Sequence, residues 1–174
     1  MNFEKELQYL QDRIHIQDTI SRYAIGQDAH QGNDWNVLEQ WKDTFTSDAM
    51  LDFTVFGIPV CSYEQLAFYM RGNETQKGKM NEVFSNWQHM LGLPLVSVQE
   101  NEATARTDVW ATHNSITNKE VSPYSLYAAG AFHDKLVRTP QGWRIQLRRM
   151  ELYFMNTISV VAMPGNVVDV ISGT

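Results

Sequence analysis

The chain has 174 residues, 43% of them hydrophobic and 20% charged, a balance typical of a soluble globular protein with a single domain over residues 1–174. A formal net charge of −6 argues against nucleic acid or an anionic membrane as a partner, because both require a basic face. The lone Cys61 excludes an internal disulfide framework and indicates a cytoplasmic location, and no apolar run approaches the ~20 residues that span a membrane.

The first third of the chain is predicted to be mainly helical. Residues 4–30 form one long amphipathic helix, followed by a second helix over 34–42. The buried face of the long helix is expected to hold Leu10, Ile16, Ile20, Tyr23, Ala24 and Gln27. A short strand at 50–56 leads to a turn at 57–59 and then to a third helix over 62–71, with Ser62 as its N-cap. Residues 72–79 are expected to form a polar loop or lid.

The second half changes to a β pattern. Four long β-rich segments lie near residues 84–98, 103–117, 122–138 and 143–158, and short polar connections join them. Such connections are typical of hairpins in an antiparallel meander, with Pro94 marking a bulge or an edge. Helices followed by a long curved antiparallel sheet predict an α+β fold, in which the sheet wraps the N-terminal helices as a cone with an apolar interior.

One histidine lies in an apolar strand. In the stretch NWQHMLGLPLVSV, His89 shares its odd-numbered parity with Trp87, Leu91, Leu93 and Leu95. Because alternate side chains of a strand face the same side, His89 is predicted to point into the interior. It is either a satisfied core histidine or a base held in a dry pocket.

Asp28 offers that histidine a partner. It lies in the last turn of the long helix, at the edge of the buried face, where the helix dipole disfavours a carboxylate. It is either a solvated acid at a helix end or the partner of His89. A carboxylate bonded to one imidazole nitrogen fixes the tautomer and makes the other nitrogen a general base.

Two further histidines follow on the next strands. His113 can approach His89 across a hairpin, whereas His133 neighbours Asp134 and is expected to face outward. Neither spacing matches a metal motif, so no metal is expected. Of Arg148 and Arg149, one must face the core side, where it needs an anion from the protein or from a ligand.

Four segments in this order resemble the SnoaL-like family of the nuclear-transport-factor-2-like superfamily. They are RYAIGQD, then DW and WKDTFTSDAMLDF, then QHMLGLPLVSV, and finally GAFHDKLVRTPQGWRIQLRR. The resemblance implies the α+β cone. It also implies an activity among the dehydratases, dehydrochlorinases, isomerases and polyketide cyclases of that superfamily.

The resemblance also implies roles for individual residues. Asp28 and His89 match the Asp–His dyad of the dehydratase branch, His113 matches a second active-site histidine, and Arg148 matches a pocket arginine. The serine and asparagine of scytalone dehydratase fall near the small residues Ala129 and Ala131, which puts that particular substrate in doubt. Candidate substrate-binding residues are Tyr23, Trp41, Phe53, Trp87, Trp110 and Phe132.

The resulting hypothesis is a cofactor-independent lyase acting on a hydrophobic, aromatic or polycyclic small molecule, with His89 as the base. An isomerase or cyclase using the same dyad is the first alternative, and a non-catalytic binding or oxygenase-partner module is the second. A homo-oligomer, a dimer or trimer, is also expected. Its contact is predicted on the outer sheet face, because residues 121–137 carry apolar side chains on both parities.

Overall fold

The computed structural model describes residues 3–28, 37–116 and 122–159. The helices are α1 (Phe3–Asp28), α2 (Val37–Trp41), the 3-10 turn η1 (Thr54–Phe56), α3 (Tyr63–Arg71) and α4 (Lys79–Val83). The strands are β1 (Phe45–Asp52), β2 (Phe84–Leu91), β3 (Leu95–Gln99), β4 (Glu102–Ser115), β5 (Tyr124–Thr139) and β6 (Gly142–Ser159).

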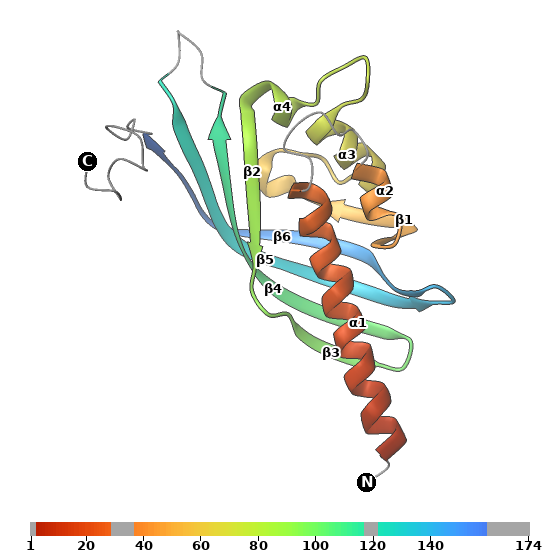
Figure 1. The fold of residues 1–174 in the computed structure, drawn as a ribbon. Helices are drawn as coiled ribbons and strands as arrows, with labels where there is room; N and C mark the ends of the chain where they lie inside the picture. Colours follow the sequence, from red (N-terminus) through yellow and green to blue (C-terminus); the bar gives the residue numbers. More distant parts are fainter. Residues whose placement is uncertain (1–2, 29–36, 117–121, 160–174) are drawn as a thin grey trace, which may run out of the picture.

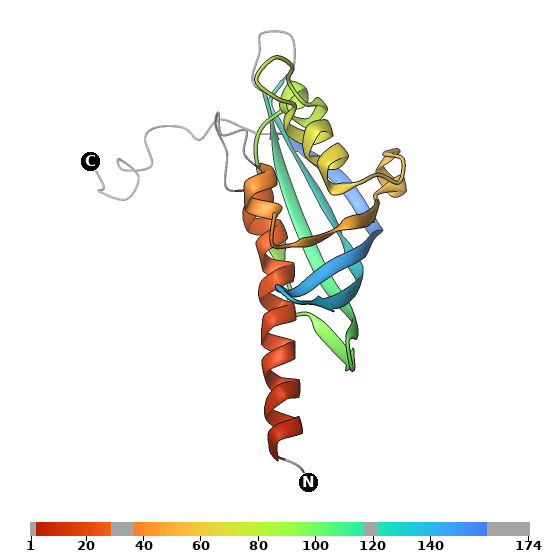
Figure 2. The ribbon, with the colours of Figure 1, turned by 90° about the vertical axis from the view of Figure 1, so that its right-hand side faces the viewer.

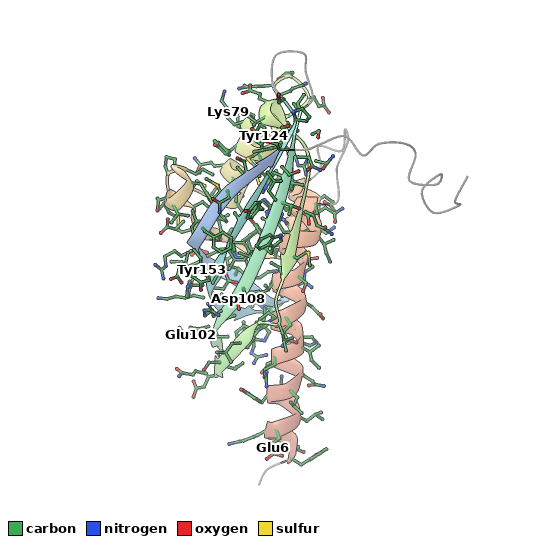
Figure 3. All side chains as sticks on the ribbon, turned by 90° about the vertical axis from the view of Figure 1, so that its left-hand side faces the viewer. Glu6, Lys79, Glu102, Asp108, Tyr124 and Tyr153 are labelled. Atoms are coloured by element: carbon green, nitrogen blue, oxygen red, sulfur yellow. The ribbon has the colours of Figure 1, made fainter. Side chains whose placement is uncertain are left out.

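The six strands form one curved sheet with the order β1-β6-β5-β4-β2, and β3 pairs with β4 beyond the end of β2. Figures 1 and 2 show α1 lying along one face of the sheet, with α2 and α3 on the same side near one end. In Figure 3, Lys79 and Tyr124 mark that end and Glu102 lies toward the other. The α+β prediction, with helices packed on a curved sheet, is confirmed.

The sheet is mixed, which corrects the prediction of a wholly antiparallel one. The hairpins β4–β5 and β5–β6 are antiparallel as expected. However, β1 pairs with β6 in parallel, with Met50 opposite Leu147 and Asp52 opposite Arg149. β1 also spans Phe45–Asp52 instead of the predicted 50–56, because FTSDA belongs to the strand and Thr54–Phe56 form the 3-10 turn η1.

The segment predicted as one strand over 84–98 is two strands. β2 ends with Leu91 opposite Val109, and β3 resumes with Leu95 opposite Arg106. Three residues therefore face two on β4, which confirms the bulge expected at Pro94. The inversion of facing leaves Leu93 and Leu95 81% and 73% exposed, so these two do not share the inward direction predicted for them.

The helix ends follow local rules. In α3 the backbone N–H of Gln65 donates to Ser62 Oγ, and the N–H of Ser62 donates to Gln65 Oε1, a reciprocal cap that confirms the predicted start. The predicted turn at 57–59 begins with Gly57 at φ +75°, a backbone conformation that favours glycine. The short helix α4 (Lys79–Val83) was not predicted, and it begins at the last residue of the loop expected over 72–79.

Two other expectations are affected. Leu10 is 53% exposed instead of buried with the rest of the α1 face. The long helix was predicted to end at residue 30 and the second helix to begin at residue 34. Both positions lie outside the described residues. Within the part of the chain that is described, no helix has the length and apolar character needed to cross a membrane.

Candidate active site

The C-terminal end of α1 is held in place by two buried side chains. The carbonyl oxygen of Gln27 accepts a 2.6 Å hydrogen bond from Arg71 Nη2 and a 3.1 Å bond from Trp87 Nε1. The Arg71 guanidinium also lies over the Trp87 ring, 3.8 Å from its centroid. A cation at this helix terminus complements the helix dipole, and the contacts fix the position of the next residue, Asp28.

Asp28 binds His89 twice. Its Oδ1 lies 2.8 Å from His89 Nδ1, and its Oδ2 accepts a 2.6 Å bond from the His89 backbone N–H. This N–H is available because His89 is on β2, at the edge of the sheet. Since an ionised carboxylate only accepts hydrogen bonds, Nδ1 carries the hydrogen and Nε2 is left as the acceptor. The predicted contact between the two side chains is therefore confirmed.

His113 lies beside His89 on the neighbouring strand. The two rings meet edge to face, with centroids 5.5 Å apart, and Phe84 and Trp87 pack against the other sides of His113. Burial, with a smaller contribution from the His89 charge, lowers the pKa of His113 to about 3. His113 is thus neutral at physiological pH and offers one N–H donor and one acceptor nitrogen.

This burial predicts a pH dependence of stability. The unfolded chain protonates His113 below about pH 6.5, whereas the folded chain does so only near pH 3. The unfolded state therefore binds more protons in this window, and the free energy of unfolding falls as the pH is lowered from 6.5 towards 3. The loss from this group is at most about 1.4 kcal/mol per pH unit.

Urea unfolding at pH 7, 6 and 5 measures this slope. In His113→Phe, which keeps an aromatic ring without a titrating group, the slope over this range is expected to be clearly smaller. An equal slope in the wild type and the variant would contradict the assignment.

His89 and His113 both face a cavity of about 270 Å³ between the sheet and the α3 side of the molecule. Its lining is mostly apolar and aromatic. The residues are Gln27, Phe53, Phe56, Ile58, Leu66, Tyr69, Met70, Met80, Phe84, His89, His113, Leu126, Ala128 and Met155. Of the predicted substrate-binding residues, only Phe53 is among them.

Gln27 adds a polar group that the sequence did not single out. Its side chain is 5% exposed and lines the cavity. Nε2 lies 3.2 Å from Met70 Sδ, which can only accept, so the amide is oriented with its nitrogen toward the sulfur. Oε1 is then buried without a hydrogen-bond partner among the described residues.

Several predicted site residues belong to the core instead of the cavity wall. Tyr23 is 1% exposed and stacks on Trp41, and burial raises the pKa of its hydroxyl above the usual range. Phe132 packs edge to face on Tyr23. Trp87 contributes by holding Gln27, as described above. Four of the predicted substrate-binding side chains are therefore buried and do not line the cavity: Tyr23, Trp41, Trp87 and Phe132.

Arg148 is also a core residue. Its Nε and Nη2 each donate a 2.7 Å bond to the carboxylate of Asp134, and both side chains are fully buried. The anion needed by the inward-facing arginine is thus a carboxylate of the protein. The structure does not place Arg148 among the cavity-lining residues, and it remains a catalytic candidate only through the resemblance.

Trp110 lies on the opposite face of the sheet. Odd-numbered residues of β4 are buried, so the even-numbered Trp110 points outward, is 39% exposed and stacks on Tyr127. Its predicted role in the pocket is therefore wrong. The β5 residues in the cavity are Leu126 and Ala128, rather than Ala129 or Ala131. His133, as expected, faces away from the cavity and contacts Glu151.

Comparison with known proteins establishes the family. The family model of the SnoaL-like domain matches residues 8–149. The chain belongs to the SnoaL-like family. No curated protein matches it.

Solved structures agree with this assignment. A hexachlorocyclohexane dehydrochlorinase from Novosphingobium barchaimii has a TM-score of 0.71 at 15% identity, covering 92% of this SnoaL-like chain and 99% of its own. A protein assigned as a scytalone dehydratase from Novosphingobium aromaticivorans has a TM-score of 0.63 at 17% identity, with 92% and 95% covered. A Kribbella flavida protein gives 0.68 at 19% identity, with 85% and 95% covered. At these identities the likeness shows the nuclear-transport-factor-2-like fold.

Proposed function

We propose that this SnoaL-like protein is a cofactor-independent lyase that eliminates a hydroxyl or similar group from a hydrophobic, cyclic small molecule. The observation that carries the proposal is the pair of hydrogen bonds between His89 and the Asp28 carboxylate, which leaves Nε2 as the acceptor on a histidine that lines an apolar cavity. A base held in this way removes a proton from a carbon next to an activating carbonyl group.

In the proposed step, His89 both takes up the proton and returns it. Nε2 takes the proton as the C–H electron pair forms a C=C bond and the C–O bond to the leaving hydroxyl breaks. The imidazolium returns that proton to the departing oxygen, which leaves as water, and His89 is neutral again. Asp28 orients the ring and stabilises the transient imidazolium at 2.8 Å from Nδ1.

His113 supplies a donor for the carbonyl oxygen. Its Nδ1 is buried without a partner among the described residues, and an orphaned lone pair costs less than an orphaned N–H. The favoured tautomer therefore carries the hydrogen on Nε2, and a neutral N–H of this kind stabilises the developing oxyanion.

The cavity restricts the substrate class. Its volume of about 270 Å³ is small for a ligand site and suits a compound of one or two rings. The relatives assigned as a dehydratase and a dehydrochlorinase carry out eliminations, which supports the same reaction class for this chain.

Two matched probes separate elimination from its alternatives. The lyase is expected to convert 3-hydroxy-1-tetralone, a two-ring β-hydroxy ketone, to the dehydrated product, followed by absorbance. It is also expected to exchange the α-protons of 1-tetralone, which lacks the leaving group, in deuterated water followed by NMR. Exchange without elimination would favour an isomerase or cyclase, and neither reaction would favour a non-catalytic module.

A further inference from the structure

Helix α1 carries a second apolar face, roughly opposite the one that packs on the sheet. Phe3, Leu7, Leu10 and Ile14 are 75%, 45%, 53% and 56% exposed. Figures 1 and 2 show this N-terminal part of α1 extending past the sheet, and Figure 3 places Glu6 on the same free end. No described part of the chain covers these four side chains, which are named the α1 seam below.

The spacing of the α1 seam identifies the kind of partner. Its members are separated by four, three and four residues, the alternation of positions d and a in a heptad repeat. Side chains at this spacing interdigitate with those of another helix. The next two positions of the repeat are Gln17 and Ser21, so the apolar seam is confined to the first half of α1.

The flanking charges identify the partner as a second copy. Glu6 and Arg13 lie on the same flank of the seam, one heptad apart, and neither forms an ion pair within the described part of the chain. In an antiparallel pair, Leu7 faces Leu10 and Phe3 faces Ile14 of the second copy. On the flank, Glu6 of each copy then lies against Arg13 of the other.

We propose that the protein forms a two-fold symmetric dimer through antiparallel pairing of the α1 seam. The arrangement closes on itself, opposes the two helix dipoles and keeps Gln17 and Ser21 out of the contact. A parallel pair would instead bring these polar residues together. Because only four side chains from each copy are buried, the interface is small and dissociation is expected in the micromolar range.

The dimer leaves the two cavities accessible. Asp28 lies at the other end of α1, and a helix rises about 1.5 Å per residue, so the cavity is distant from the seam. The proposal therefore does not depend on the lyase function.

Sedimentation velocity at about 5 to 200 µM protein tests the proposal. The wild type is expected to shift from monomer to dimer over this range, and Leu10→Glu, which places a charge in the seam, is expected to remain monomeric. Ile25→Glu is the matched control, because Ile25 is also an exposed apolar residue of α1 but lies outside the seam. Its association should equal that of the wild type.

Charge exchange tests the antiparallel register. Glu6→Arg alone and Arg13→Glu alone each create like-charge contacts and should weaken association by about 3- to 10-fold at low salt. The double variant Glu6→Arg/Arg13→Glu restores opposite charges and should recover wild-type association. A wild type that stays monomeric, a dimer unaffected by Leu10→Glu, or a double variant no better than the singles would overturn the proposal. The second result would favour the outer sheet face as the interface.

Discussion

Replacing His89 by glutamine is expected to lower the rates of tetralone exchange and elimination by about 10²- to 10⁴-fold while the protein remains folded. Glutamine is polar and similar in volume, and the backbone N–H of residue 89 can still donate to Asp28. The change therefore removes the basic Nε2 and little else. Initial rates and circular dichroism spectra of the wild type and the variant measure the two effects separately.

One control changes a histidine elsewhere on the same sheet, and the others change the partner of His89. His133→Gln changes a histidine on the outer face and should leave the rates unchanged. Asp28→Asn should lower the rates in the same direction as His89→Gln. The double variant should be little worse than either single, because the two residues act as a unit. A folded His89→Gln variant with full activity would return this histidine to a structural role.

Replacing Asp134 by alanine is expected to lower the free energy of unfolding by about 3–5 kcal/mol. The side chains of Asp134 and Arg148 are both 0% exposed, and Arg148 also lies over the rings of Tyr23 and Phe132, 4.3 Å from each centroid. Removing the carboxylate leaves the buried Arg148 guanidinium without an anion, and the surrounding aromatic rings stabilise it only in part. Urea denaturation of the wild type and the variant measures the loss.

Two comparisons identify the cause of that loss. Asp108→Ala breaks a surface pair with Arg106 and should leave the unfolding midpoint nearly unchanged. Asp134→Leu combined with Arg148→Met replaces the buried pair by apolar groups and should be less destabilised than Asp134→Ala. If Asp134→Ala costs no more than Asp108→Ala, the buried pair is not the source of stability described. Activity of the double variant would also separate a core role of Arg148 from a catalytic one.

The elements with strong local signals were predictable. The period of α1, the cap at Ser62 and the polar connections between β4, β5 and β6 each gave the right structure. The helix dipole and the parity of His89 left the contact with Asp28 as one of two open interpretations, and the resemblance to the SnoaL-like family favoured it.

Features set by distant pairing were not predictable in this way. The parallel pairing of β1 with β6 depends on a contact about 100 positions apart, as in Met50 opposite Leu147. The burial of Arg148 in the core depends on its ion pair with Asp134, which lies fourteen positions earlier on another strand. The orientation of the Gln27 amide follows from its contact with Met70, which leaves no pattern in the sequence.

One error could have been avoided from the sequence. Trp110 and His113 differ in parity on the same strand, so the two cannot share a face without a bulge between them. Predicting His113 inside the cavity therefore already placed Trp110 outside it. The same holds for Leu10, which was assigned to the buried face of α1 but shares the exposed face with Leu7 and Ile14.

The most direct test of the proposed base is the tautomer of His89, observed by long-range ¹H–¹⁵N NMR near pH 7.5 in protein labelled with ¹⁵N-histidine. If Asp28 accepts from Nδ1, the wild type shows a protonated Nδ1 and an unprotonated Nε2. In Asp28→Asn, which keeps only one acceptor oxygen for two donors, this tautomer should lose its dominance. A wild-type spectrum with the hydrogen on Nε2 would contradict the account, because that nitrogen could then not take a proton from a substrate.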